Sequence, residues 1–228
     1  MRMKRHKSIA IDGPSGAGKS SMARSLAKRL GFLHVDTGAI YRAVGLAVYR
    51  HGKDPRDFRA VEDLLPSIDV SLRHGADGVQ HMLLDKADVT DQIRGRDVSR
   101  YASQVSSIPA VRAFLLSMQR ELPERYDVIM DGRDIGTVVL PHADVKLFLT
   151  ASPEERAQRR LTELVQQGTD VNYDSVLRDI RERDDRDSSR DAAPLRKADD
   201  AVLVDSTGLS IEATLDLLVL ISRDKLGM

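Results

Sequence analysis

The strongest constraint on this chain is a glycine-rich segment near its N-terminus with the pattern GxxxxGK[ST]. The segment follows a short apolar run, Ser8–Asp12, and it precedes a helical pattern, Lys19–Leu30. Its residues are Gly13, Pro14, Ser15, Gly16, Ala17, Gly18, Lys19 and Ser20. Placed between a strand and a helix, this pattern predicts a phosphate-binding loop in an α/β fold.

The residue types in this loop suit the triphosphate of a nucleotide. Glycines allow the backbone to curl, so that several N–H groups point at phosphate oxygens. The helix that follows directs its positive N-terminal end at the same anion. We expect Lys19 to reach the β- and γ-phosphates and the Ser20 hydroxyl to ligate Mg²⁺. The loop therefore predicts ATP binding with Mg²⁺ as the companion ion.

The composition argues against several other functions. The 228 residues include 35 basic and 35 acidic side chains, so the net charge gives no electrostatic reason to bind nucleic acid. The absence of cysteine excludes disulfides, thiolate metal sites and a cysteine nucleophile. The apolar run after the basic N-terminus is too short for a signal peptide, and no stretch approaches the ~20 apolar residues of a membrane span. We therefore expect a soluble cytoplasmic protein that binds no membrane.

Short apolar runs alternate with helical patterns along the chain, which favours a parallel sheet wrapped by helices. The runs lack polar alternation, as expected for strands that are covered on both faces. The expected strands are Ser8–Asp12, Leu33–Val35, Val128–Asp131, Val145–Thr150 and Ala201–Asp205. The expected helices are Lys19–Leu30, Ala39–Arg50, Pro109–Glu121, one from about Tyr173, and Ser210–Lys225.

Two segments depart from this alternation. Within residues 63–98, three short strands are expected at Ile68–Arg73, Val79–Leu84 and Lys86–Val89, joined by Gly and Asp turns. Residues 154–174 are charged and contain Gly168, as a flap over a site would. We therefore predict a core domain of residues 1–62 and 99–228, a lid at about 154–174 and a β-rich insertion at 63–98.

One group of polar residues, Asp36–Arg42, follows the second expected strand. Ligands of open α/β sheets bind beyond the carboxyl ends of the strands, so this position suits a binding loop. The structural alternative for Thr37 is a cap of the next helix. Arg42 lies off the apolar face of that helix, where it faces either a ligand or water.

A second group, Asp131-Gly132-Arg133-Asp134, ends an apolar strand. Asp131 has the placement of an acid that orients Mg²⁺ or its water shell. Arg133 would stand at the carboxyl edge of the sheet, near a bound phosphate. The structural alternative is an aspartate that caps a turn and pairs with the arginine.

A third group belongs to the helix expected from about Tyr173. Continued along this helix, Arg183, Asp187 and Arg190 share a face that also carries apolar residues and so points toward the body of the protein. An inward row of Arg, Asp and Arg is unusual for a solvated helix. The alternative is a surface helix held by ion pairs, which describes its other charges, Glu182, Asp184, Asp185 and Arg186.

These groups are connected by the electrostatics of phosphate transfer. If the acceptor is itself a phosphate, two polyanions meet in one site, and fixed arginines must offset their repulsion. A terminal phosphate has its second pKa near ~6, so it is already an anionic nucleophile at neutral pH. No general base is then required, in agreement with histidines that are scattered along the chain without metal-like spacing.

Taken together, these residues resemble the bacterial-type cytidylate kinases, members of the nucleoside monophosphate kinase group. The matching motifs occur in family order over almost the whole chain. They are Ile11–Ser20, Asp36–Arg42, Ala102–Val105, Asp131–Asp134, Glu155–Arg160, Arg183–Asp187 and Asp205–Thr207. The resemblance implies a P-loop kinase core of five parallel strands, an enlarged β-containing insertion and a short lid.

The resemblance also implies a set of site residues. Cytidine monophosphate would be contacted by Ser103, Arg112, Asp134, Asp187 and Arg190, with Thr37, Arg42, Arg133 and Arg183 around its phosphate and sugar. Arg156, Arg159 and Arg160 would belong to the lid that closes on ATP, and Ser21 would extend the ATP site where many members have Thr. The implied reaction transfers a phosphoryl group from ATP to CMP, and also to dCMP, catalysed by Lys19, Arg133 and Arg183 with Mg²⁺ held by Ser20 and Asp131.

Three other functions stay open at this point. A kinase for AMP, UMP or a hydroxylated metabolite is one, although a hydroxyl acceptor would need a base that is not evident. A nucleotide-dependent switch is another, but the only asparagine, Asn172, is followed by tyrosine, so the guanine-reading Asn-Lys-x-Asp element is absent. A nucleic-acid-dependent ATPase is disfavoured by zero net charge and 4% aromatic residues. The resemblance further implies a monomer.

Overall fold

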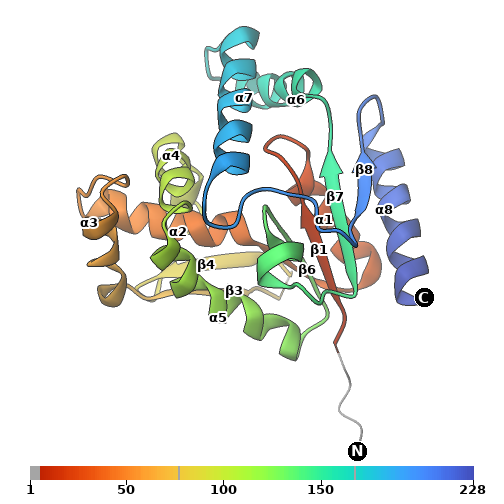
Figure 1. Ribbon diagram of the computed structural model, residues 1–228, viewed down its shortest axis with the longest axis horizontal. Helices are drawn as coiled ribbons and strands as arrows, with labels where there is room; N and C mark the ends of the chain where they lie inside the picture. Colours follow the sequence, from red (N-terminus) through yellow and green to blue (C-terminus); the bar gives the residue numbers. More distant parts are fainter. Residues whose placement is uncertain (1–5, 77, 167) are drawn as a thin grey trace, which may run out of the picture. The chain divides into compact units, whose positions relative to one another are not determined.

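The computed structural model describes residues 6–76, 78–166 and 168–228, and it divides into two compact units (Figure 1). One unit contains Leu33–Tyr126, and the other contains Lys7–Phe32 together with Asp127–Met228. The predicted insertion, residues 63–98, falls inside the first of these units. The predicted boundaries of that insertion, at residues 63 and 98, remain predictions from the sequence.

The first unit contains helices and a small sheet. Its strands are β2 (Leu33–Asp36), β3 (Val70–His74), β4 (Gln80–Leu84) and β5 (Ala87–Asp88). Its helices are α2 (Thr37–Arg50), α3 (Phe58–Glu62), α4 (Arg96–Val105) and α5 (Pro109–Arg125), with 3₁₀ turns η1 (Leu65–Ser67) and η2 (Gln92–Arg94). Strands β3, β4 and β5 form an antiparallel sheet in that order, which confirms the β-rich insertion.

The second unit carries most of the larger sheet. Its strands are β1 (Ser8–Asp12), β6 (Val128–Gly132), β7 (Val145–Thr150) and β8 (Val202–Asp205). Its helices are α1 (Lys19–Leu30), α6 (Pro153–Gln166), α7 (Tyr173–Ser189) and α8 (Ile211–Leu226), with a π-helical turn, η3 (Ile135–Val139). The larger sheet has five strands in the order β2-β6-β1-β7-β8. The predicted α/β fold with a five-stranded parallel sheet is therefore confirmed.

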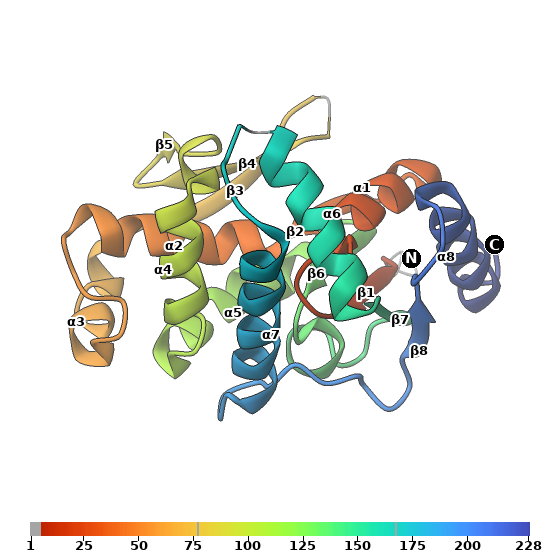
Figure 2. The same ribbon diagram turned by 90° about the horizontal axis from the view of Figure 1, so that it is seen from above.

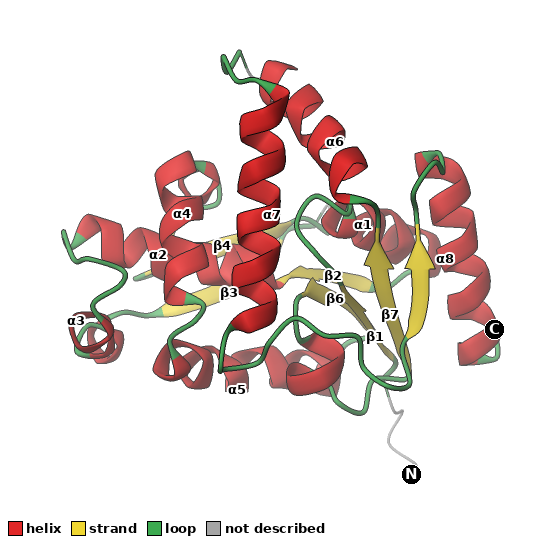
Figure 3. Cartoon of the chain, turned by 45° about the horizontal axis from the view of Figure 1, so that its top comes forward, coloured by secondary structure: helices red, strands yellow, loops and turns green. Residues whose placement is uncertain are grey.

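Strand β1 organises the second unit. It pairs in parallel with β6 on one side and with β7 on the other, and β7 pairs in parallel with β8 (Figure 3). All five residues of β1 are buried, as expected for a central strand covered on both faces. Because the strands run in one direction, the carboxyl ends of β1 and β6 lie at the same edge of the sheet, and Asp12 stands opposite Gly132.

An apolar core fixes helices α1 and α8 to the sheet. The two helices lie side by side (Figure 2), and their inner faces share one cluster with the strands. Its large fully buried side chains include Ile9, Ile11, Leu26, Ile129 and Leu147. The cluster holds the first turn of α1 directly beyond β1, which is where the phosphate-binding loop must connect them.

Helices α6 and α7 form a separate packed pair (Figure 1). Ala157, Val176 and Ile180 are buried between them. Helix α6 covers most of the predicted lid segment. Movement of this pair stays a prediction.

Within the described residues, no helix combines the length and the apolar character that crossing a membrane requires.

Candidate active site

The phosphate-binding loop joins the end of β1 to the start of α1, as the sequence predicts. Gly13 has φ +150, and a Cβ atom there would lie 1.9 Å from the backbone oxygen of Leu149 on β7. No side chain fits at that distance, so glycine is required where the loop leaves the sheet. Gly18, at φ +81, immediately precedes α1. The loop is thus tied to the sheet at one end and to a helix N-terminus at the other, a geometry suited to anions.

Lys19 is buried beneath this loop. Its side-chain nitrogen donates a hydrogen bond of 2.7 Å to the backbone oxygen of Pro14, and the residue is only 6% exposed. Burial and the nearby charges of Arg133 and Arg183 hold the pKa of Lys19 well below its usual range, although Asp131 and Asp12 oppose them. The arginine charges that disfavour the cationic form of Lys19 would favour a polyanion bound beside it.

Ser20 and Asp131 place oxygen atoms beside Lys19. The Ser20 hydroxyl donates to Oδ2 of Asp131 at 2.6 Å, and Asp131 is 2% exposed at the end of β6. Among the described residues, no cluster of three or more His, Cys, Asp or Glu side chains could hold a metal ion by itself. A hydroxyl and a carboxylate fit Mg²⁺, which is commonly held by one or two carboxylates together with substrate phosphates and water.

Asp12 is a site residue to which the sequence analysis gave no role. It is 4% exposed, and its two carboxylate oxygens accept hydrogen bonds from the backbone N–H groups of Ile135 and Gly136, both at 2.7 Å. Burial raises the pKa of Asp12 from 3.8 to about 6, against the effect of these two bonds. Asp12 therefore joins the residue before the phosphate loop to turn η3. An acid that ends an otherwise apolar strand was the available signal.

The burial of Asp12 leads to a prediction about stability. The folded state holds a proton at Asp12 up to about pH 6, whereas the unfolded chain loses it near 3.8. Raising the pH through this window therefore lowers the free energy of unfolding, by up to about 3 kcal/mol from this group. Asp12→Asn lacks this titration. In urea denaturation, the free energy of unfolding of the natural chain, relative to that of Asp12→Asn, should be lower at about pH 7 than at about pH 4. Equal differences at both pH values would contradict this role of burial.

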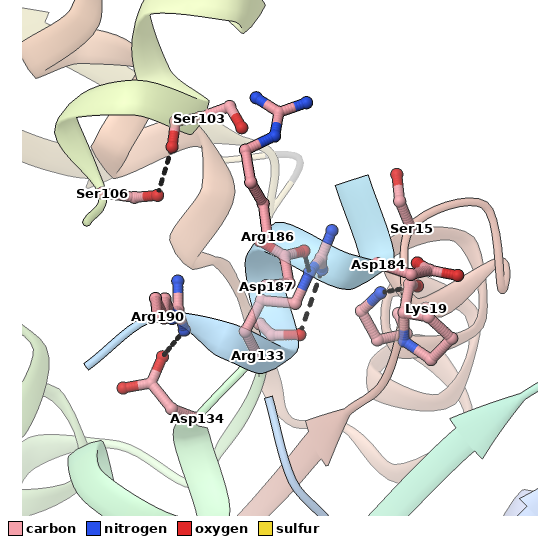
Figure 4. Close-up of polar contacts among 12 residues, drawn as sticks. Ser15, Lys19, Ser103, Ser106, Arg133, Asp134, Asp184, Arg186, Asp187 and Arg190 are labelled. Atoms are coloured by element: carbon pink, nitrogen blue, oxygen red, sulfur yellow. Dashed lines mark hydrogen bonds and ion pairs between the residues drawn. The ribbon is translucent and has the colours of Figure 1, made fainter. Parts of the chain in front are cut away.

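Two ion pairs join α7 and its C-terminal end to the segment after β6. Nε of Arg133 donates to Oδ2 of Asp187 at 2.7 Å, and an Nη2 of Arg190 lies 3.5 Å from Oδ1 of Asp134 (Figure 4). Asp187 is 8% exposed. Burial alone would raise the pKa of Asp187, but the charges of Arg133, Arg183 and Arg190 lower it below its usual value. Asp187 is therefore held as a carboxylate.

The structure confirms the inward direction of this row and corrects its extent. Helix α7 ends at Ser189, so Arg190 is not helical; it has φ −64 and ψ 140, and its Nε donates to the backbone oxygen of Ala193 at 2.6 Å. The backbone oxygen of Asp187 accepts from Leu195 N at 2.7 Å, which turns the chain back along the helix end. Arg183 lies one helical turn before Asp187, and its charge acts on both Asp187 and Lys19.

The three arginines of α6 have different surroundings. Arg156 is 3% exposed and bonds to three acceptors of the protein. Arg159 pairs with Glu155 and donates to the hydroxyl and backbone oxygens of Ser206, at 3.2 and 3.0 Å. Arg160 pairs with Glu163 on the exposed surface. Ser21 is also exposed, on the first turn of α1.

Four further predicted site residues belong to the first unit. Thr37 is buried as the first residue of α2, and Arg42 pairs with Asp36 at 2.8 Å. Ser103 lies on α4, and Arg112 on α5 donates to the backbone oxygen of Ser106 at 3.1 Å. The guanidinium of Arg112 also stacks over the ring of Tyr41, 5.5 Å from its centre. These contacts leave their roles toward a ligand as predictions.

The cap of α2 is not Thr37 but Asp36. The Asp36 side chain accepts from the backbone N–H of Ala39 at 3.0 Å, while the backbone of Asp36 is held by both ends of the Gln80 amide on β4. Aspartate binds the first helical N–H groups well and also favours the positive helix end. Thr37 is therefore not needed as the cap.

Comparison with known proteins identifies the family of this chain. A family model described as cytidylate kinase matches residues 9–223. A cytidylate kinase from Caldicellulosiruptor bescii is 53% identical over 207 residues, covering 91% of each chain. Another from Carboxydothermus hydrogenoformans is 49% identical over 216 residues, covering 94% of this chain and 97% of that one. A crystal structure of an uncharacterized protein from Eubacterium ventriosum shares the fold, with a TM-score of 0.51 and 13% identity over 97% of this chain and 99% of that one. The chain thus belongs to the cytidylate kinase family.

Proposed function

We propose that this chain transfers the γ-phosphoryl group of ATP to CMP, giving ADP and CDP, and that dCMP is a second acceptor. The observation that carries the proposal is the geometry of the phosphate loop: Lys19 is buried beneath it, 2.7 Å from the backbone oxygen of Pro14, with the charges of Arg133 and Arg183 nearby. Arg133 and Arg183 act on it electrostatically, although cations repel one another. Such an arrangement is stable when polyanions occupy the site, and phosphoryl transfer between two nucleotides brings two of them together.

The donor would be held by the phosphate loop. Lys19 and the loop N–H groups would bind the β- and γ-phosphates, and Gly13, Gly16 and Gly18 allow the backbone to curve around them. Residues Gly13, Pro14, Ser15, Gly16, Ala17, Gly18, Lys19, Ser20 and Ser21 form the proposed donor site, together with Arg159 and Arg160 of α6. When bound beside Ser20 and Asp131, Mg²⁺ would neutralise charge on the transferring phosphates.

The transfer itself needs charge stabilisation more than proton chemistry. The phosphate of CMP is already anionic at neutral pH, so it can attack the γ-phosphorus directly without a general base. Arg133 and Arg183 would stabilise the charge that develops on the moving group, since guanidinium groups bind oxyanions in bidentate fashion. The phosphoryl group then passes in line, with no covalent enzyme intermediate.

CMP would be recognised by the polar residues that the family resemblance assigns to it, of which Thr37, Asp134 and Asp187 are buried. In the second unit, the assigned residues are Asp134, Asp187, Arg183 and Arg190; in the first unit, they are Thr37, Arg42, Ser103 and Arg112. A site built to pair buried hydrogen-bonding groups rejects a base that leaves them unpaired. The proposal therefore includes a preference for cytosine over adenine.

An acceptor panel tests this function. ADP formation would be measured from ATP and Mg²⁺ with CMP, dCMP, UMP, AMP or no acceptor. We expect turnover that depends on CMP or dCMP and is much weaker with AMP. ADP release at one rate, whatever the acceptor, would instead indicate an ATPase or a switch, and it would remove the acceptor assignments while leaving the phosphate loop.

Asp131→Asn tests the proposed ion site. The variant keeps the size of the side chain and its ability to accept from Ser20, but it loses the charge that attracts a cation. We expect the Mg²⁺ concentration for half-maximal rate to rise about tenfold or more, the range seen for lost ion contacts. Titration of Mg²⁺ at saturating ATP and CMP measures it. An unchanged Mg²⁺ requirement would exclude Asp131 from the ion site.

A monomeric state and a cytoplasmic location complete the proposal. Both come from the sequence and its family resemblance. Size-exclusion chromatography with light scattering tests the first: a dimer mass at working concentration would contradict it.

A further inference from the structure

Arg156 is a buried arginine, 3% exposed, that contacts the phosphate loop. Its Nε donates to the backbone oxygen of Ala151 at 2.9 Å, and Nη1 donates to the backbone oxygen of Ser15 at 2.9 Å. Its Nη2 pairs with Oδ2 of Asp184 at 2.6 Å. The Arg156 side chain is 4% exposed and that of Asp184 is 22% exposed. One guanidinium therefore joins the base of α6, the phosphate loop and α7.

The same arginine packs against the loop. Gly16 has φ +76, and a Cβ atom there would lie 3.2 Å from Cβ of Arg156 and 3.6 Å from Cδ1 of Ile180 on α7. The loop at Gly16 is thus covered by the stem of Arg156 and by α7.

Peptide geometry gives this contact a consequence for ligand binding. In a trans peptide, the C=O and the following N–H point in opposite directions. No peptide bond of the described chain is cis. Because the Ser15 oxygen points at Arg156, the N–H of Gly16, in the same peptide plane, points away from it. Fixing the oxygen therefore fixes the direction of a loop N–H donor.

We propose that Arg156 and Asp184 are positioning residues: they hold the Ser15–Gly16 peptide so that its N–H faces the donor phosphates. Arg156 acts through the loop and does not itself contact ATP, unlike the role that family resemblance implies for it. Asp184, which the sequence analysis grouped with solvated surface charges, orients the guanidinium of Arg156. The proposal rests on the proposed function in taking ATP as the donor.

The two roles of Arg156 differ in what they require of Asp184. If Arg156 contacts ATP directly, Asp184 competes with the nucleotide for the guanidinium, so its removal leaves ATP affinity unchanged or improves it. If Arg156 positions the loop, loss of either partner weakens ATP binding, and loss of both is no worse than loss of one.

A double-mutant cycle decides between them. Arg156→Lys, Asp184→Asn and the double variant would be compared with the natural chain by calorimetric titration with ATP in the absence of acceptor. Lysine retains the charge but cannot make the three-way contact. We expect each single variant to raise the Kd for ATP about tenfold, the range for a charged hydrogen bond, and the double variant to match the weaker single variant. The Kd for CMP alone should stay within about twofold of the natural value.

The exposed pair Glu154–Arg181 provides the control. It also joins α6 to α7, at 2.8 Å, but its side chains are 54% and 59% exposed. Arg181→Gln and Glu154→Gln are expected to leave the Kd for ATP unchanged. Thermal unfolding checks the fold of each variant. If Asp184→Asn does not fold, Asp184→Glu, which keeps the charge at a changed distance, takes its place in the cycle.

Three results would overturn the proposal: natural ATP affinity in the Asp184 variant, additive effects in the double variant, or an equal loss of ATP affinity in the Arg181 and Glu154 controls. Failure of the natural chain to bind ATP would overturn the proposed function, and the positioning role with it. If the natural chain binds ATP but any of those three results is found, the positioning role is overturned and the proposed function stands.

Discussion

Lys19→Met is expected to lower kcat for phosphoryl transfer from ATP to CMP by about 10²–10³-fold, the range for removal of one preorganised donor from a developing oxyanion. Methionine fills much of the space of the buried lysine stem, so the loss is of charge and not of packing. The variant should also be the more stable protein without ligand. Burial and two arginines disfavour the charge of Lys19 in the folded chain, as its depressed pKa records.

The combination of lost activity and retained or increased stability distinguishes catalysis from folding. Steady-state kinetics and urea denaturation measure the two quantities. Lys28→Met is the matched control, because Lys28 lies on the same helix but is exposed, and it should change neither. Near-normal turnover in Lys19→Met would remove Lys19 from the reaction.

Asp187→Asn is expected to raise the KM for CMP by about 10–100-fold while the KM for ATP changes little. Hydrogen bonds to charged groups contribute about 1.5–3 kcal/mol, which sets this range. The carboxylate is buried and its pKa is lowered by three arginines, so at neutral pH it is the charged acceptor that the exocyclic amine or a ribose hydroxyl of CMP would require.

Asp187 also holds Arg133, so a purely structural role must be separated from CMP recognition. A structural loss would impair both substrates, since Arg133 also acts on Lys19. Asp185→Asn, an exposed neighbour on the same helix, should leave both KM values unchanged. Equal losses for ATP and CMP in Asp187→Asn would assign the residue to support of Arg133 alone.

The sequence predicts the parts of this fold that depend on local patterns. Strands β1 and β7 and helix α1 occupy the residues expected for them, because short apolar runs and a glycine-rich loop determine them locally. The antiparallel strands of residues 63–98 follow from Gly and Asp turns in the same way. Strand order and the parallel register come from the structure, since they depend on contacts between distant segments.

The parts that could not be predicted depend on partners far apart in the chain. The role of Asp184 is visible only when α6 brings Arg156 to it, 28 residues away. Asp12 binds turn η3 across more than 120 residues. Helical periodicity predicts that α7 continues through Arg190, but the helix ends at Ser189. There the backbone N–H of Leu195 donates to the backbone oxygen of Asp187 and turns the chain back. In the first two cases, a hydrogen bond between distant segments decided what a local pattern left open; in the third, the partners are eight residues apart.

The most direct test of the central claim follows the phosphorus atom. ATP labelled at its γ-phosphate would be incubated with CMP and Mg²⁺, and the labelled products would be separated after less than one turnover. Direct transfer predicts label in CDP, in equal amount to the ADP formed, with no label bound to protein and almost none formed by Lys19→Met. Label in free phosphate, at a rate that does not depend on CMP, would contradict it.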